Sequence, residues 1–346
     1  MVFSFIFLQS FYRQFYFSFM TFIIYSDDYL LHDNPNHPEN ANRLKAIIDF
    51  LKKTPFYEKL EFIKPEKANE EEIAKVHSID MIEEAKNIGW LDMDTYTNEY
   101  SYEIAKLAVG GVIKACKLIM ERGGNAFCLI RPPGHHATSK KSMGFCIFNN
   151  VAIASNFLAE KGYKILIFDH DVHHGNGTQE IFYSRNDVLY QSIHLYPHYP
   201  MTGLINEVGW KEGEGYTVNA PLPHGAGEEC IEKLLQEIFI PIAEEFSPDF
   251  ILISAGFDSH HADYLGGMKL TVNFFGKVID YFKEVQNKII CCLEGGYNLE
   301  YLPKCVAKEI SHLIGNPMNF DDEAKGKDCN DVLQGLKKKM REYWKI

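Results

Sequence analysis

The chain has 346 residues, of which 46% are hydrophobic and 24% charged, an ordinary mixture for a globular protein of one large or two smaller domains. A formal net charge of −12 argues against a general nucleic-acid-binding protein, which would normally carry a basic face. The same charge suits a site that attracts cationic substrates, provided that the acidic residues lie close to it.

The eight cysteines include no CxxC pair and show no spacing typical of a secreted disulfide framework. Most lie in apolar runs. We therefore expect all of them to be reduced core residues of a cytoplasmic protein.

Residues 1–21 form a separate, aromatic-rich segment that is interrupted by Gln9, Arg13 and Gln14. The segment lacks the basic start, unbroken apolar core and cleavage site of a signal peptide, and its polar residues count against a membrane span. Because Met20 directly precedes the first convincing strand, a mis-assigned start codon is the favoured interpretation, and a membrane anchor is the alternative.

From residue 22 onward, apolar runs alternate with helical patterns, which predicts a parallel sheet covered by helices on both faces. No linker, repeat or low-complexity tract divides residues 22–346, so we expect a single domain there. The predicted strands are 22–25, 126–130, 164–168, 188–193, 250–254 and 288–293, and the predicted helices are about 100–122, 149–162, 226–245, 271–286, 298–314 and the basic stretch 333–345.

Polar loops follow five of these strands where each strand ends. Their sequences are RPPGHHA, DHDVHHGNG, HLYPHYP, AGFDSHH and EGGYNL. In open α/β sheets the ligand site lies beyond the carboxyl ends of the strands, so the five loops should converge on one pocket.

A divalent metal would make the charged loop after residue 168 tolerable, because burying unpaired carboxylates costs several kcal/mol. Asp171 and His173 are two residues apart in extended chain and point to the same side. Asp258, from another strand end, completes a set of one imidazole and two carboxylates, which leaves a fourth position for water as in catalytic zinc sites. The alternative is that both aspartates cap the helices that follow, which leaves His135, His136 and His173 unexplained.

RPPGHHA, DHDVHHGNGTQ, SAGFDSH and LEGGYNL, with HPENANRL near the start, resemble the motifs of the histone deacetylase and acetylpolyamine amidohydrolase superfamily. DVHHGNG and LEGGYNL look more like its class II and bacterial or archaeal branch than class I. The resemblance spans residues 22–315. It implies an arginase-like three-layer αβα sandwich around a mainly parallel sheet, and metal-dependent hydrolysis of an N-acetyl amide.

The resemblance assigns the chemistry residue by residue. The three predicted ligands match the family's zinc ligands, with ferrous iron as the alternative metal. His136 matches the general base and His135 its partner, the latter held by Asp169. Asn176 matches the residue that orients His136, at a position where class I members carry an aspartate. Tyr297 matches the donor to the developing oxyanion. An ordinary half-buried tyrosine is the alternative for this last residue.

The walls of the substrate tunnel are implied in the same way. Phe145, which follows Gly144, and Tyr199 match the aromatic pair that lines the acyl-lysine tunnel. Leu265 stands where polyamine-specific members can carry a glutamate. Asp94 is either the rim carboxylate that binds the substrate backbone or a simple turn residue.

Three further residues have open roles. Arg43 lies either near a product-release channel or on a helix surface, and His260 and His261 are expected to form a solvated rim.

The resemblance also implies a structural potassium ion beside the catalytic metal. Its ligands would be the carboxylate of Asp169, the hydroxyl of Ser192 and the carbonyls of Asp171, His173 and Ile193. A second, more remote cation site would use carbonyls around Phe182, Arg185, Val188 and Tyr216.

The expected function is removal of acetyl groups from lysine side chains of proteins. The alternatives are a deacetylase of acetylpolyamines or other small acyl amines and, in a different class, a non-catalytic acetyl-lysine-binding protein. The partners are then acetylated substrates, without direct nucleic-acid or membrane binding, and the sequence does not give the oligomeric state.

Overall fold

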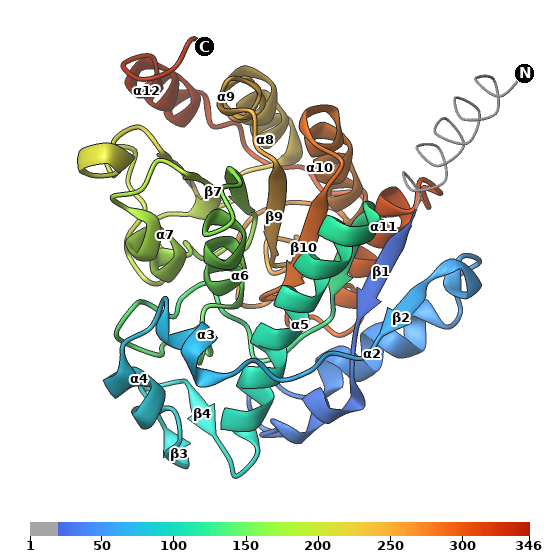
Figure 1. Cartoon of the computed structure of the whole chain (residues 1–346). Helices are drawn as coiled ribbons and strands as arrows, with labels where there is room; N and C mark the ends of the chain where they lie inside the picture. Colours follow the sequence, from blue (N-terminus) through green and yellow to red (C-terminus); the bar gives the residue numbers. More distant parts are fainter. Residues whose placement is uncertain (1–19) are drawn as a thin grey trace, which may run out of the picture.

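The computed structural model describes residues 20–346, so residues 1–19 of the predicted extension over residues 1–21 lie outside this part. Eight strands of the described chain form one sheet in the order β2-β1-β5-β10-β9-β6-β7-β8, and every neighbouring pair is parallel (Figure 1). The strands are β1 (Thr21–Ile24), β2 (Glu61–Ile63), β5 (Asn125–Cys128), β6 (Ile165–Asp169), β7 (Val188–Leu195), β8 (Thr217–Leu222), β9 (Phe250–Ala255) and β10 (Ile289–Leu293).

Helices lie on both faces of this sheet. The α-helices are α2 (Asn42–Leu51), α3 (Glu70–Ala74), α4 (Ile79–Glu84), α5 (Ser101–Arg122), α6 (Asn150–Ala159), α7 (Asn176–Phe182), α8 (Glu228–Leu234), α9 (Ile240–Phe246), α10 (Val272–Val285), α11 (Leu302–Leu313) and α12 (Asn330–Met340). Short 3-10 turns, η1 (Asp27–Leu31), η2 (Tyr57–Lys59) and η3 (Lys211–Gly213), and a hairpin of β3 (Gly89–Trp90) and β4 (Tyr96–Thr97) lie in the connections.

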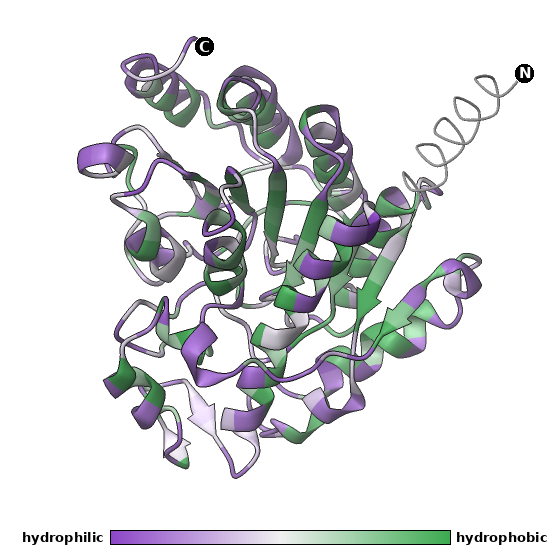
Figure 2. Cartoon of the chain, viewed as in Figure 1, coloured by the Kyte–Doolittle hydropathy of each residue, from purple (hydrophilic) through white to green (hydrophobic). Residues whose placement is uncertain are grey.

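Alternation along the strands sends neighbouring side chains to opposite helical layers. On β6, Phe168 packs against Phe282 of α10, whereas the next residue, Asp169, contacts His135 on the other side of the sheet. Apolar strands occupy the centre of the molecule and polar segments its periphery (Figure 2). The fold is therefore the predicted three-layer α/β architecture around a parallel sheet.

All six predicted strands and all six predicted helices are present, with ends shifted by a few residues. The predicted 226–245 helix is divided into α8 and α9 by one π-helical stretch, η4 (Leu235–Phe239). The two edge strands, β2 and β8, were not predicted. The first has only three residues, and the second contains Pro221, which weakens a strand pattern. Within residues 20–346, no helix combines the length and the apolarity that crossing a membrane requires.

The prediction that every cysteine is reduced is wrong. Cys230 of α8 and Cys329, just before α12, form a disulfide, and the remaining six cysteines are buried and free. The two partners are 99 residues apart in sequence, and their Cα atoms are 5.4 Å apart, within the usual range for a disulfide. No local spacing predicts such a pair, because tertiary packing brings α8 and the start of α12 together.

Alkylation of the unfolded protein tests this bond. We expect six labelled cysteines without reductant and all eight after reduction, whereas a Cys329→Ser variant should label fully in both conditions. Reduction should lower the free energy of unfolding of the wild type by ~2–4 kcal/mol, because the disulfide restricts the unfolded chain. Eight labelled cysteines without reductant would contradict the pairing.

Candidate active site

A pocket of about 220 Å³ opens where the loops after β5, β6, β7, β9 and β10 meet. The loops therefore converge as the sequence predicts for the carboxyl ends of parallel strands. The pocket is lined by Asp94, Pro133, His135, His136, Gly144, Phe145, His173, His198, Tyr199, Leu265, Gly295 and Tyr297.

The predicted metal ligands lie together at the base of this pocket. The Nδ1 atom of His173 lies 3.0 Å from a carboxylate oxygen of Asp171 and 3.0 Å from one of Asp258. Both carboxylates are fully buried. The backbone N–H of Gly295 donates to Asp171 at 2.8 Å, and that of Val172 donates to Asp258 at 2.8 Å, so the protein backbone orients both carboxylates.

Two glycines make this close approach feasible. A Cβ atom on Gly256 would lie 2.0 Å from the nearest oxygen of Asp171, and one on Gly295 would lie 2.3 Å from an oxygen of Asp258. Any larger residue would displace the carboxylates. The glycines of AGFD and EGGY thus leave the space that the donor set occupies.

The alternative that Asp171 and Asp258 cap helices is wrong. The N-cap of α7 is Gly175 and that of α10 is Thr271, and neither helix has a side-chain cap bond. One imidazole and two carboxylates whose donor atoms all lie within 4.8 Å of one another fit a divalent cation. A single N–H on His173 cannot point at both carboxylates, whereas a cation between the three groups would contact all of them.

The tandem histidines differ in their partners. Nδ1 of His135 lies 3.1 Å from a carboxylate oxygen of Asp169, which also accepts the hydroxyl of Tyr190. Burial by itself would lower the pKa of His135, but Asp169 and Asp171 outweigh it and raise the pKa to about 10. His135 is therefore positioned as a charged group.

His136 contacts the neutral amide of Asn176 instead. Its Nδ1 atom lies 2.8 Å from Oδ1 of Asn176, whose Nδ2 faces the sulfur of Met143, so Nδ1 donates the hydrogen. The other ring nitrogen then keeps its lone pair. Burial, and after it the charges of His135 and His173, lower the pKa of His136 well below its usual range. His136 is thus held as a neutral base.

Tyr297 is 6% exposed and closes one side of the pocket. Its backbone N–H donates to Asp263 at 2.6 Å, and the guanidinium of Arg43 lies 5.0 Å from its ring centre. Arg43 is completely buried and donates to the carbonyls of Gly296 and Glu294, so the helix-surface alternative for Arg43 is wrong. Its role in product release stays a prediction.

The aromatic rings of Phe145 and Tyr199 both line the pocket. The ring of Phe145 meets Tyr297 edge-on at 5.8 Å, and that of Tyr199 meets His136 edge-on at 5.1 Å. A Cβ atom on Gly144 would lie 2.5 Å from the His136 ring, so the wall approaches the base closely at this point. Leu265 lines the same pocket and is half-buried.

Asp94 lies in the pocket lining, and the neighbouring Asp92 is the turn residue. Asp92 Oδ1 accepts the backbone N–H groups of Asp94 and Thr95, at 3.0 and 2.7 Å. Burial and the nearby charge of Asp92 raise the pKa of Asp94 to about 6.

The two side chains predicted to hold potassium, Asp169 and Ser192, lie next to each other in the sheet. Asp169 and Ser192 are register partners on β6 and β7 and are both fully buried. At the second, more remote cation site that the resemblance implies, the carbonyls of Phe182 and Tyr216 already accept hydrogen bonds from backbone N–H groups. Both cation sites stay predictions.

Two residues near the site were missed from the sequence. His198 stacks on His173 at 4.8 Å and donates to the carbonyl of Leu265. Its position directly before Tyr199 was the available signal. Glu294, the first residue after β10, accepts the backbone N–H groups of Gly134 and His135 and so ties the β5 loop to the β10 loop.

The expectation of a solvated rim is wrong for His260, which is buried, whereas the side chain of His261 is 24% exposed. Their Nε2 atoms lie 3.0 and 2.8 Å from the two carboxylate oxygens of Asp322, and His260 is buried. The Nδ1 atom of His260 accepts the N–H of Ala262, so Nε2 carries the hydrogen and donates it to Asp322. This cluster is a hydrogen-bonded clamp, since a metal on Nε2 would require the hydrogen on Nδ1.

Comparison with known proteins agrees with this geometry. Residues 37–313 match the model of the histone deacetylase domain. The chain belongs to the histone deacetylase family.

Relatives of the histone deacetylase family match along nearly the whole chain. Probable deacetylases from Archaeoglobus fulgidus and Methanothermobacter thermautotrophicus are 36% and 40% identical, cover 94% and 93% of this chain, and are themselves covered to 99%. The crystal structure of the HDA15 HD domain superposes with a TM-score of 0.87 at 34% identity, covering 94% of this chain and 97% of that one. The protein is thus a hydrolase of this family, whose members are generally metal-dependent.

Metal analysis tests the donor set. The purified protein should bind about one catalytic divalent ion per chain, and Asp258→Ala should lose it, because two of the three donors cannot hold the ion tightly. Asp322→Asn, in the His260–His261 clamp, is the matched control and should keep the ion. If Asp258→Ala keeps the ion and Asp322→Asn loses it, the metal binds to His260, His261 and Asp322 instead, and the assignment is wrong.

Proposed function

We propose that this protein hydrolyses the acetyl amide of N-acetyl-lysine side chains in proteins, with zinc held by Asp171, His173 and Asp258, and with ferrous iron as the alternative metal. The proposal depends on one observation. A neutral imidazole, a tyrosine and three metal-binding side chains face the same narrow pocket. When bound, the metal would polarise the acetyl carbonyl and lower the pKa of the attacking water to about 7.

The protein's own groups handle the protons. His136 is the general base: its free ring nitrogen takes a proton from the attacking water and later delivers one to the departing lysine amine. Asn176 fixes the orientation of His136 without adding a charge. His135, paired with Asp169, supplies positive charge beside the reacting carbonyl.

Tyr297 is the proposed donor to the carbonyl oxygen as negative charge develops on it. Such a preorganised donor typically contributes about 2.7–4 kcal/mol to transition-state stabilisation. The ties of its loop to Asp263 and Arg43 limit the reorganisation that the reaction requires. The presence of both the tyrosine and the full donor set counts against a non-catalytic acetyl-lysine-binding protein. A potassium ion held by Asp169, Ser192 and the Asp171, His173 and Ile193 carbonyls would stabilise the loop from behind.

The pocket walls favour acetyl-lysine over an acetylpolyamine. The methylenes of a lysine side chain can lie along Phe145, Tyr199 and Leu265, and Leu265 offers no partner for a second ammonium. The alternative has one observation in its favour, since the carboxylates of Asp92 and Asp94 lie together at the rim, where a polyamine's distal cation could meet them.

Steady-state kinetics decide between the two substrates. We expect a higher kcat/KM for an acetyl-lysine peptide than for N-acetylputrescine or N-acetylspermidine, and Leu265→Glu should shift the ratio toward the polyamines. Tyr297→Phe should lower kcat at least about 100-fold without losing metal, which excludes a contaminating deacetylase. A clear wild-type preference for the polyamine would overturn the choice of substrate, and inactivity on both would overturn the proposed function.

The pH dependence of KM tests the role of Asp94. Its carboxylate is ionised above a pKa of about 6 and can then accept peptide N–H groups, so the KM of a peptide should rise as the pH falls through 6. The other titratable groups near the Asp94 carboxylate are Asp92 and Tyr199. The Nε2 atom of His37 lies 3.0 Å from the backbone carbonyl oxygen of Asp94. Asp94→Asn should remove the inflection, and N-acetyl-lysine lacking flanking peptide bonds should not show it. An unchanged inflection in Asp94→Asn would contradict the assignment.

A further inference from the structure

The tunnel wall at Phe145 has an unusual backbone. Gly144 and Phe145 have φ angles of 58° and 69°, and the backbone groups of Met143 and Cys146 on either side exchange hydrogen bonds of 3.1 and 3.0 Å. A two-residue turn with positive φ at both central positions normally carries glycine, asparagine or aspartate there. A phenylalanine keeps such a conformation only where its surroundings hold it in place.

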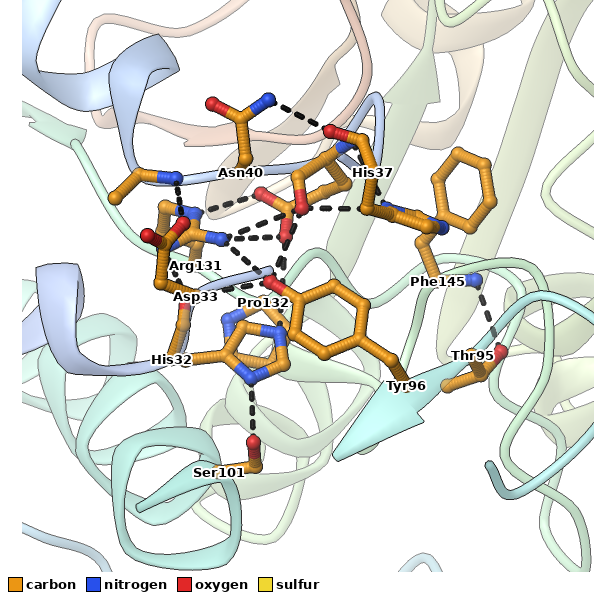
Figure 3. A network of polar contacts seen from close by, with 12 residues as sticks. His32, Asp33, His37, Asn40, Thr95, Tyr96, Ser101, Arg131, Pro132 and Phe145 are labelled. Atoms are coloured by element: carbon orange, nitrogen blue, oxygen red, sulfur yellow. Dashed lines mark hydrogen bonds and ion pairs between the residues drawn. The ribbon is translucent and has the colours of Figure 1, made fainter. Parts of the chain in front are cut away.

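The side chain of Thr95, from a distant part of the sequence, stabilises this conformation of Phe145. The backbone N–H of Phe145 donates to Oγ1 of Thr95, 3.0 Å away, across 50 residues of chain (Figure 3). Thr95 is completely shielded from solvent. The His37 ring supports the same wall, since it meets the Phe145 ring edge-on at 4.5 Å.

Thr95 itself sits on a rigid base. Its N–H donates to Asp92, and its carbonyl accepts the N–H of Leu91 at 2.9 Å. The next residue, Tyr96, stacks on His32 at 4.4 Å, and its hydroxyl accepts a hydrogen bond from the buried Arg131 (Figure 3). Thr95 therefore joins the hydrogen-bonded turn that carries Asp92 to the positive-φ turn at Gly144 and Phe145.

We propose that Thr95 is a positioning residue for substrate binding: its hydroxyl oxygen holds Phe145 in the positive-φ turn and so sets the distance between the two aromatic walls of the tunnel. This inference depends on the proposed deacetylation, because it assumes that an acyl-lysine chain lies between Phe145 and Tyr199. None of the hydrogen bonds of Thr95 goes to a predicted metal ligand, to His136 or to Tyr297. Its loss should therefore weaken substrate binding and leave the chemical step nearly intact.

The chain offers a matched pair of threonines for the test. Thr95→Val removes the acceptor with little change of shape, and Thr95→Ser restores it. Thr97, in the same hairpin, is also buried, but its hydroxyl donates to the Asn87 carbonyl at 2.7 Å, away from the tunnel. Thr97→Val thus removes a comparable hydrogen bond of the hairpin without touching Phe145.

KM and kcat for an acetyl-lysine peptide should be measured at about pH 8, where Asp94 is ionised, together with the melting temperature and metal content. For Thr95→Val we expect KM to rise about ten-fold and kcat to change less than about two-fold, because a displaced wall misplaces the substrate. Thr95→Ser should lie close to the wild type. Thr97→Val should keep the wild-type KM even if its melting temperature falls as much as that of Thr95→Val.

Hydrogen exchange supplies a readout that does not need activity. The amides of residues 143–146 should exchange faster in Thr95→Val than in the wild type and remain unchanged in Thr97→Val. A wild-type KM and wild-type exchange in Thr95→Val, or an equal rise of KM in Thr97→Val, would overturn the inference. Inactivity of the wild type would instead refute the proposed function, and the exchange measurement would still show whether Thr95 holds the wall.

Discussion

Two buried carboxylates, Asp171 and Asp258, lie on either side of one imidazole nitrogen, and much of the neighbouring structure serves to keep them there. Burial and the nearby Asp171 raise the pKa of Asp258 above its usual range, which shows how unfavourable a second negative charge is at this depth. Backbone N–H groups bind the outer oxygens, and glycines leave the space. A divalent cation between the three side chains would supply the remaining compensation, since buried charges need partners.

The loops that line the candidate active site are joined by buried charged side chains. Glu39 lies between Arg131, which precedes the tandem histidines, and Arg43, which binds the backbone beside Tyr297. Burial would raise the pKa of Glu39, but the two arginines outweigh it and hold the pKa well below its usual range. Removing one partner from such a buried network typically costs about 3–5 kcal/mol.

The differences between the sequence-based expectations and the structure lie mainly at the edges and in the rim. The central strands were predictable because strands buried on both faces are continuously apolar, whereas β2 and β8 have one open edge and weaker patterns. The turn that carries Asp92, Asp94 and Thr95 has no periodicity to read. Its role depends on what packs against it, which is Phe145 from a segment 50 residues away.

The sequence by itself determined the α/β class, the order of the central strands along the chain and the convergence of five polar loops, because strand periodicity and the geometry of parallel sheets fix where strand ends lie. Its motifs also named the three candidate metal donors, the tandem histidines and Tyr297, which all face one pocket or its base. Only the tertiary structure decided several of the partners: Asp322 for His260, Cys329 for Cys230 and Thr95 for Phe145. Hydrogen bonds, disulfides and close contacts depend on distances of a few ångströms between segments far apart in the chain, and local sequence patterns carry no information on those distances.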